Sequence, residues 1–403
     1  MNPDLAKLQP YPFEKLAALK GGITPPAGLD HIALSIGEPK HPTPNFIAEE
    51  LLTHLHSLSS YPITKGTQAL RQAIADWLIH RFKLLNGIDP ETQVLPVNGT
   101  REALFAFAQT IIDRSQNPLV LMPNPFYQIY EGAALLAGAE PHFLPCTAES
   151  GFTPDFAAVN DATWDRCQLL YLCSPHNPTG SVIGIEQLQQ LINLAAKHNF
   201  IIAADECYSE IYPDESNPPP SLLQAATEMG NTEYQHCMVF NSLSKRSNAP
   251  GMRSGFVAGN AAIIASFCRY RTYHGCAMPL PVQAASIKAW GNETHVQHSR
   301  ELYREKFTAV LNALGDLLPI QQPDAGFYLW PETPIPDPEF AQGLFAQQNI
   351  SVLPGSYLSR NLNGHNPGQN RIRMALVAPL DECIAAARRI KTFIESTENR
   401  RQI

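Results

Sequence analysis

The run NSLSKRSNAPGMRSG, residues 241–255, brings together an amine and several groups that can bind an anion. Ser242 and Ser244 precede Lys245, and Arg253 follows the lysine closely. A lysine amine forms a Schiff base with a carbonyl compound, whereas hydroxyls and a guanidinium bind phosphate. The run follows a short apolar stretch and is rich in serine, with two glycines and a proline, which is typical of neither a helix nor a strand. These residues therefore indicate a binding site.

Polar side chains also follow the other short apolar runs of the chain. They are Asn177 after LLYLC, Asp205 and Tyr208 after FIIAA, and Gly99, Thr100 and Arg101 after VLPV. Taken singly, each has an ordinary structural explanation as a turn former, a helix cap or a solvent-exposed charge. In open α/β sheets, however, ligands bind at the carboxyl ends of the strands. Their occurrence at successive strand ends therefore favours one shared site.

The combined set of groups fits pyridoxal 5'-phosphate. Its aldehyde requires an amine, for which Lys245 is the candidate, and its pyridinium nitrogen requires a carboxylate, for which Asp205 is the candidate. Its phosphate suits a helix N-terminus with hydroxyls and an arginine. The expected phosphate ligands are Ser242, Ser244 and Arg253, with Gly99 and Thr100 at the helix start. No metal site is expected, because none of the eight cysteines lies in a C-x-x-C pair.

The same motifs resemble those of the class I and II aminotransferases of fold type I. The family pattern S-x-S-K-x-x-x-x-x-G-x-R-x-G matches SLSKRSNAPGMRSG, N-P-[TS]-G matches residues 177–180, and D-E-x-Y matches residues 205–208. A further pattern, Y-x-x-x-x-G-x-x-x-L-R, matches residues 61–71. The resemblance extends from SIGEP (35–39) to RIRMALV (371–377), which is nearly the whole chain.

The resemblance implies roles for individual residues around the cofactor. Lys245 would form the Schiff base and move a proton, Asp205 would pair with the ring nitrogen, and Asn177 and Tyr208 would bind the phenolic oxygen of the ring. Tyr127 would stack on the ring unless it is an ordinary core aromatic, and Gln128 after it departs from the usual proline. The cofactor-binding set is Gly99, Thr100, Arg101, Tyr127, Asn177, Asp205, Tyr208, Ser242, Ser244, Lys245, Arg253 and Tyr61.

Other expected roles concern the substrate and a second subunit. Arg373 would bind the substrate α-carboxylate, with Arg371 as the competing candidate, because a strand places both on one face. Gly37 and Asn177 would lie beside the substrate. Tyr61 would reach the phosphate of a neighbouring subunit, which implies a homodimer with shared active sites.

The expected reaction is transamination between an amino acid and the 2-oxoglutarate/glutamate pair. The stretches MNPDLAKLQPYPFEKL, IGEPKHPTP and LPVNGTREALFAFAQ are similar to aminotransferases that act on N-succinyl-LL-2,6-diaminopimelate in lysine biosynthesis. Alternative substrates are alanine, aspartate, an aromatic amino acid or N-acetylornithine, and a carbon–sulfur lyase on the same fold is an alternative reaction. A distal substrate carboxylate would need a further cation, for which Arg269 and Arg271 are candidates unless they lie on a solvated helix face.

An α/β fold is needed to bring these residues together. Short apolar runs alternate with helical patterns and predict a mostly parallel sheet between helices; the resemblance implies seven strands and a smaller α/β domain. Residues 1–40 are rich in proline and glycine and predict an irregular arm. Expected domains are an N-terminal arm with part of the small domain (1–44), a large cofactor-binding domain (45–280) and a small C-terminal domain (281–403). The predicted helices are 67–85, 101–114, 186–199, 282–317 and 381–397, and the predicted strands of the large sheet include 118–122, 168–173, 200–205, 237–242 and 255–259.

Composition narrows the class of protein. The 403 residues carry a formal net charge of −8 and no long basic run, which disfavours binding to nucleic acid or an anionic membrane. No signal peptide or apolar stretch of membrane-spanning length is apparent, and a nicotinamide dehydrogenase is disfavoured because no G-x-G-x-x-G occurs. A cytoplasmic enzyme acting on small molecules is expected.

Overall fold

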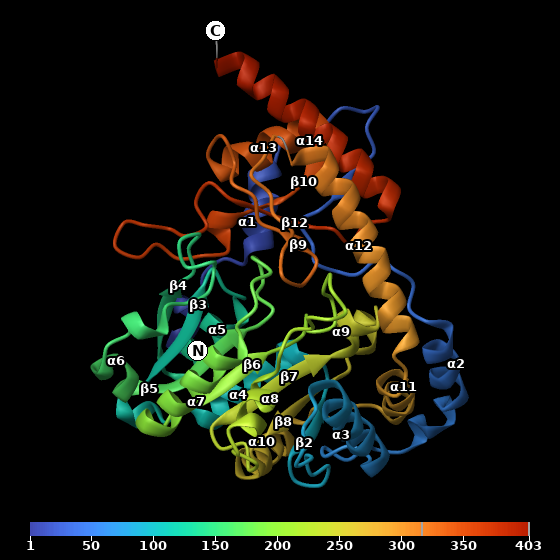
Figure 1. The fold of residues 1–403 in the computed structure, drawn as a ribbon, viewed down its shortest axis with the longest axis vertical. Helices are drawn as coiled ribbons and strands as arrows, with labels where there is room; N and C mark the ends of the chain where they lie inside the picture. Colours follow the sequence, from blue (N-terminus) through green and yellow to red (C-terminus); the bar gives the residue numbers. More distant parts are fainter. Residues whose placement is uncertain (316, 402–403) are drawn as a thin grey trace.

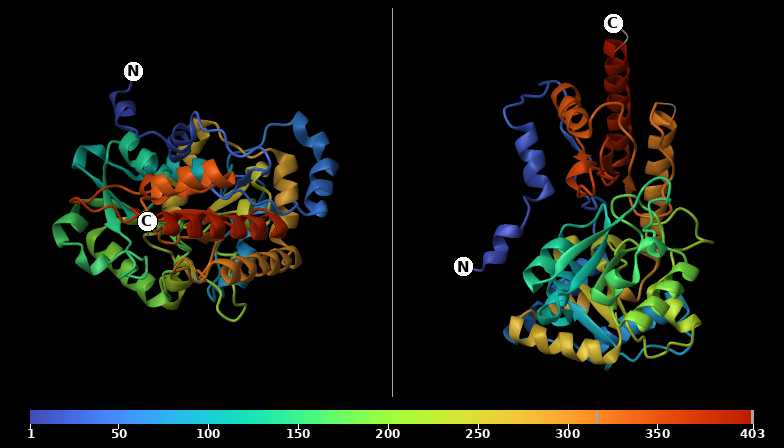
Figure 2. Two further views of the ribbon diagram at one scale, coloured as in Figure 1. Left: turned by 90° about the horizontal axis from the view of Figure 1, so that it is seen from above. Right: turned by 90° about the vertical axis from the view of Figure 1, so that its left-hand side faces the viewer.

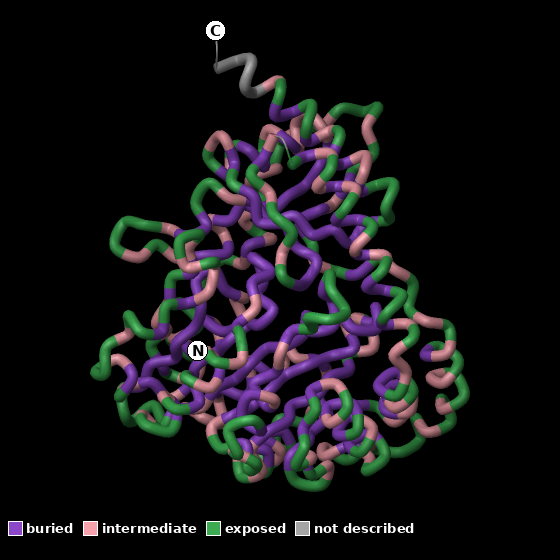
Figure 3. Tube along the Cα trace, in the orientation of Figure 1, coloured by how far each residue is buried: buried purple, intermediate pink, exposed green. Residues whose placement is uncertain are grey.

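The computed structural model describes residues 1–315 and 317–401. Figure 1 shows a larger part built on one central sheet and a smaller part above it, with helix α12 (Thr294–Leu314) passing between them. Figure 3 shows buried stretches running through the centres of both parts. No helix in the described ranges has the length and apolar character needed to cross a membrane.

The central sheet has seven strands, in the order β2-β8-β7-β6-β5-β3-β4. Strand β8 is antiparallel to both its neighbours, and the other pairs are parallel, which confirms the expected mostly parallel seven-stranded sheet. The strands are β2 (Val94–Val97), β3 (Leu119–Asn124), β4 (Glu140–Pro145), β5 (Cys167–Cys173), β6 (Ile201–Asp205), β7 (Cys237–Ser242) and β8 (Gly255–Gly259).

Helices cover both faces of this sheet, so its strands are apolar on both sides. Neighbouring residues of one strand enter different cores: Leu170 lies in the core beneath α3, α7, α8 and α11, whereas Leu169 lies in the core beneath α4, α5 and α10. This double burial explains the continuous apolar runs of the sequence. The helices are α3 (Gln68–Phe82), α4 (Thr100–Ile111), α5 (Ile129–Ala137), α7 (Ile185–His198), α8 (Leu222–Glu228), α10 (Ala261–His274) and α11 (Leu280–Trp290).

The smaller part combines short strands with long helices around a separate core. A three-stranded antiparallel sheet has the order β11-β12-β9, and β1 pairs with β10 in parallel. Its elements are β1 (Ile32–Ala33), β9 (Tyr328–Leu329), β10 (Ile350–Ser351), β11 (Leu353–Pro354), β12 (Ile372–Ala375), α13 (Asp337–Gln348) and α14 (Leu380–Arg401).

Two regions differ from the sequence-based expectation. The N-terminal arm, expected to be irregular, contains a 3-10 helix (Pro3–Lys7) and helix α1 (Pro12–Lys20). Proline at the first position of α1 and the Glu14 carboxylate, which accepts a hydrogen bond from the backbone of Tyr11, are start signals of a helix. Figure 2 shows this N-terminal segment running outside the larger part towards the smaller one.

The predicted helical region 282–317 is divided by a break into α11 and α12. Helix α11 contacts α3 and α2 (Asn45–Thr53), and its residues Ala285, Ala289 and Trp290 lie in a core of the larger part. We therefore propose a domain boundary after α11 rather than at residue 280.

Candidate active site

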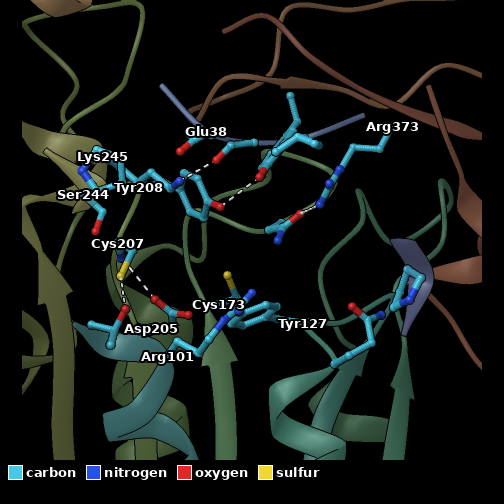
Figure 4. A pocket seen from close by; sticks show the side chains of 18 of the residues that line it. Glu38, Arg101, Tyr127, Cys173, Asp205, Cys207, Tyr208, Ser244, Lys245 and Arg373 are labelled. Carbon is cyan, nitrogen blue, oxygen red and sulfur yellow. Dashed lines mark hydrogen bonds between the residues drawn. The ribbon is translucent and has the colours of Figure 1, made fainter. Parts of the chain in front are cut away.

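A cavity of about 400 Å³ opens where β5, β6 and β7 end. Cys173, Asp205 and Ser242, the last residues of these strands, all line it. Figure 4 shows side chains from the larger part and Arg373 from the smaller part around this cavity. It brings together most of the predicted site residues: Gly37, Thr100, Arg101, Tyr127, Asn177, Asp205, Tyr208, Ser242, Ser244, Lys245, Arg253 and Arg373.

Lys245 lies in the short helix α9 (Leu243–Arg246), directly after β7. The Ser242 side chain accepts a hydrogen bond from the backbone of Ser244 and so begins the helix. The Lys245 amine donates to the Gly37 carbonyl over 2.5 Å and lies 5.4 Å from the ring centre of Phe327. Burial lowers the pKa of Lys245 to about 8, so more of this amine is neutral and nucleophilic near neutral pH than an exposed lysine would be.

Asp205 is a buried acid at the end of β6. Its carboxylate accepts hydrogen bonds from the hydroxyl of Tyr130, over 2.8 Å, and from the backbone of Cys207, over 3.3 Å. Burial raises the pKa of Asp205, and these hydrogen bonds oppose the rise. Within the described residues no basic side chain forms an ion pair with it. The Asp205 carboxylate is therefore available to form an ion pair with a cationic group of a ligand in the cavity.

An anion cradle lies beside these two residues, at the N-terminus of α4. Gly99 precedes the helix with φ +84°, and a side chain there would collide with the guanidinium of Arg253. Arg253 donates to backbone carbonyls of Pro250 and Asn98, and no carboxylate pairs with it in the described part of the chain. Thr100, Ser242 and Ser244 line the same region. Free backbone N–H groups, hydroxyls and a guanidinium make this a phosphate-binding arrangement.

Arg373 approaches the cavity from β12 and is 4% exposed. Its guanidinium donates to Asn177 Oδ1 over 3.0 Å and to the Ser35 carbonyl over 2.8 Å, while its buried Nε has no partner. Arg371 instead donates to the Trp330 carbonyl and does not line the cavity. Of the two arginines that the sequence offered for the α-carboxylate, only Arg373 is positioned to meet a ligand here.

Several lining residues carried no recognisable sequence signal. The hydroxyls of Tyr328, in β9, and Tyr208 share a hydrogen bond of 3.0 Å. The Tyr328 hydroxyl also lies so close to Gly37 that a side chain at residue 37 would collide with it. Tyr11, which also lines the cavity, comes from the N-terminal segment. Tyr130 is not a lining residue; it is buried in α5, three residues after the predicted Tyr127, and its hydroxyl donates to Asp205. Helical spacing from Tyr127 could have suggested Tyr130, whereas nothing in the sequence joins Tyr328 or Tyr11 to the motifs.

Other predicted residues lie elsewhere. Tyr61 is fully exposed and does not line the cavity of its own chain. Arg269 is exposed on α10, whereas Arg271 is buried, and one of its terminal nitrogens donates to both carboxylate oxygens of Glu102. Neither of these two arginines lines the cavity, so the geometry favours a surface position for the first and a structural role for the second.

Comparisons with known proteins all find aminotransferases, and the similarity covers nearly the full length of this chain. A family model described as aminotransferase class I and II matches residues 30–390. An LL-diaminopimelate aminotransferase of Maridesulfovibrio salexigens is 32% identical over 392 residues, covering 96% of this chain and 97% of that protein.

Solved structures are similar over the same extent. The structure of an aminotransferase from Neisseria meningitidis has 48% sequence identity and a TM-score of 0.93, covering 97% of this chain and 99% of that chain. A probable N-succinyldiaminopimelate aminotransferase from Thermus thermophilus has 26% identity and a TM-score of 0.84, covering 95% and 100%.

Proposed function

The chain belongs to the class I and II aminotransferases, and we propose that it transfers an amino group to 2-oxoglutarate from an amino acid that carries at least one distal carboxylate. Enzymes of this family use pyridoxal 5'-phosphate. The observation that carries the proposal is the Lys245 amine, with its lowered pKa, in one cavity with the buried acid Asp205 and the guanidinium of Arg373.

The residues present fit this cofactor. Asp205 would pair with the ring nitrogen, the cradle at Gly99 and Arg253 would hold the phosphate, and Tyr127 would pack against the ring. When bound, pyridoxal phosphate supplies an aldehyde that captures amines and a ring that withdraws electrons from the substrate Cα. The unused charge of Asp205 and the conformation of Gly99 support this fit independently of any sequence pattern.

The remaining side chains would handle the substrate. Arg373 would bind the α-carboxylate through its two terminal nitrogens, with Asn177 orienting the guanidinium. The Lys245 amine would remove the proton from the substrate Cα and then donate it to the carbon of the cofactor's aldehyde group. Its lowered pKa suits this exchange, because a proton carrier works best when its pKa is near the working pH. Tyr208, fixed by Tyr328, would bind the phenolic oxygen of the ring.

For the substrate we propose N-succinyl-LL-2,6-diaminopimelate, which would place the enzyme in lysine biosynthesis. The likeness to the Thermus thermophilus structure, a probable N-succinyldiaminopimelate aminotransferase, supports this choice. A second candidate is LL-diaminopimelate itself, favoured by the name of the Maridesulfovibrio salexigens relative. The two candidates differ at the remote nitrogen, which is an amide in the first and an ammonium in the second.

A panel of amino donors tests the proposal. The holoenzyme is assayed with 2-oxoglutarate and each of N-succinyl-LL-diaminopimelate, LL-diaminopimelate, N-acetylornithine, aspartate, alanine and phenylalanine. The succinylated donor should exceed alanine and phenylalanine in kcat/KM by at least ten-fold, about the effect of one well-placed charged partner. A lead for LL-diaminopimelate would replace the substrate but keep the reaction. Cystathionine is added to test the alternative reaction: its cleavage to a thiol, ammonia and a 2-oxo acid in the absence of 2-oxoglutarate would instead indicate a carbon–sulfur lyase.

We also propose that two subunits share their active sites. Tyr61 is fully exposed, and Leu52, Leu58 and Ile63 beside it in sequence are each 64% exposed, which is more apolar surface than a lone face usually presents. Sedimentation should reveal a dimer, for which two-fold symmetry is the commonest arrangement, and a fully active monomer would contradict the proposal. A cytoplasmic location is proposed because all eight cysteines are free thiols, a state that reducing compartments maintain.

A further inference from the structure

Four basic side chains line the cavity, and three of them already have a use under the proposed function. They are Arg253 at the phosphate cradle, Arg373 for the α-carboxylate, and Lys245 for the aldehyde; the fourth is Arg101. The proposed substrates bring at least one more anion into the cavity, a distal carboxylate. The Arg101 guanidinium is the lining group whose charge matches it.

The side chain of Arg101 does not join the phosphate cradle, although its backbone lies there. Its Nε donates to the hydroxyl of Tyr127 over 2.6 Å, and a terminal nitrogen donates to the hydroxyl of Tyr11 over 3.2 Å. Figure 4 shows the side chain reaching Tyr127. The cradle has its own guanidinium in Arg253, next to Gly99. Arg101 is thus directed to the side of the cavity formed by the N-terminal segment.

The charge of Arg101 is unpaired by any acid. Both of its hydrogen-bond acceptors are neutral phenols, and in the described part of the chain no carboxylate forms an ion pair with it. Two acids line the cavity, Asp205 and Glu38; Glu38 is exposed, and its carboxylate lies 3.6 Å from the amine of Lys40. The terminal nitrogens of Arg101 therefore keep N–H groups for a carboxylate, whose two oxygens they can bind as a fork.

We propose that Arg101 binds a distal carboxylate of the substrate and that the Tyr11 hydroxyl completes this subsite; this inference rests on the proposed function. Tyr11 immediately precedes α1, which packs against α13 and β11 of the smaller part. The N-terminal segment therefore supplies one wall of the specificity pocket. Arg101 sets the preference for dicarboxylic over neutral amino acids.

Matched substrates test this assignment in the holoenzyme. Glutamate and norvaline differ only in the distal carboxylate, which norvaline replaces with a methyl group. Arg101→Gln should lower kcat/KM for glutamate by about ten- to a hundred-fold, the effect of losing a charged hydrogen-bond partner, while norvaline changes less than about three-fold. Arg101→Lys keeps the charge but not the two-pronged geometry of the guanidinium, so its kcat/KM for glutamate should lie between those of the wild type and Arg101→Gln. Tyr11→Phe should also lower kcat/KM for glutamate selectively, but by less than Arg101→Gln does. Arg269→Gln, an exposed arginine outside the cavity, is the control.

Binding measurements separate this inference from the proposed function. Calorimetry on the holoenzyme compares glutarate with pentanoate, and cofactor affinity is measured on each variant. The wild type should prefer glutarate, Arg101→Gln should lose that preference, and cofactor affinity should not change. Equal losses for glutamate and norvaline, a fall in cofactor affinity, or no glutarate preference in the wild type would overturn the assignment. If no donor reacts with 2-oxoglutarate, the proposed function fails, while the glutarate comparison still decides the role of Arg101.

Discussion

Replacing Tyr130 with phenylalanine removes one hydroxyl and leaves a buried ring in place. That hydroxyl donates to Asp205 Oδ2 over 2.8 Å, and both residues are buried. The bond is made to the ionised carboxylate and therefore lowers the pKa of Asp205, against the rise that burial causes. Its loss should raise that pKa.

The magnitude follows from the strength of such bonds. A hydrogen bond to a charged group contributes about 1.5–3 kcal/mol, and one pKa unit corresponds to about 1.4 kcal/mol. The pKa of Asp205 should therefore rise by about 1–2 units in the variant. Because the ionised acid is the form that pairs with a protonated ring nitrogen, the acid limb of the kcat/KM profile should move to higher pH by the same amount. At pH values above that limb the variant should approach the wild-type rate.

A nearby tyrosine provides a matched control. Tyr171 is fully buried and stacks on Tyr130, with 4.7 Å between the two ring centres. Its hydroxyl, however, donates to the Leu104 carbonyl rather than to Asp205. Tyr171→Phe removes an equally buried hydroxyl and should lower stability without moving the acid limb. An unchanged limb in Tyr130→Phe, or an equal movement in both variants, would refute the reasoning.

Three other variants probe separate parts of the molecule. Lys245→Ala should abolish transamination, and borohydride reduction should fix the cofactor on Lys245 of the wild type only; capture on another lysine, detected by mass spectrometry, would contradict the assignment. Gly99→Ala should weaken cofactor binding by roughly ten-fold or more, since its Cβ collides with Arg253 and its φ is +84°; unchanged affinity in a spectroscopic titration would argue against the cradle. Lys306 is buried against a histidine ring, and burial lowers its pKa to about 8. The unfolded chain therefore holds a proton at Lys306 that the native state lacks between about pH 8 and 10.5, so the contribution of Lys306 to stability should rise with pH across that window by at most about 3 kcal/mol. Because other buried groups titrate in the same window, the check is the difference between the wild type and Lys306→Met in denaturant titrations, and a difference that does not change with pH would contradict the prediction.

The sequence predicted the central sheet well because its strands are buried on both faces and read as continuous apolar runs. The sequence did not predict strand β4, whose residues are EPHFLP. This strand lies at the edge of the sheet, where two prolines and partial burial are tolerated, so it lacks the continuous apolar run of the inner strands. Helix α1 escaped for a related reason. Proline and glycine in this arm are typical of irregular chain, but proline is also favoured at the first position of a helix, where Pro12 lies.

The cofactor end of the site was predictable because its residues follow strand ends in compact motifs. A parallel sheet brings such ends together regardless of their separation in sequence. The substrate end is different. Tyr11, Arg101 and Tyr328 meet through the packing of the N-terminal segment and the smaller part on the larger one, and no spacing encodes that packing. Arg101 shows the difference within one residue: its place after Gly99 and Thr100 put it in the expected cofactor-binding set, whereas its side chain donates hydrogen bonds to Tyr127 and Tyr11.

One short segment connects the two ends of the site. The Ser35 carbonyl accepts a hydrogen bond from Arg373, and the Gly37 carbonyl accepts one from Lys245. This segment leaves β1, which pairs with β10 in the smaller part, and leads to α2, which packs on the larger part through α11. The same three residues of backbone therefore fix the guanidinium proposed to bind the α-carboxylate and the amine proposed to move the proton. Any shift of the smaller part that moves β1 must change the distance between these two groups, so the packing of the two parts sets the geometry of the reaction.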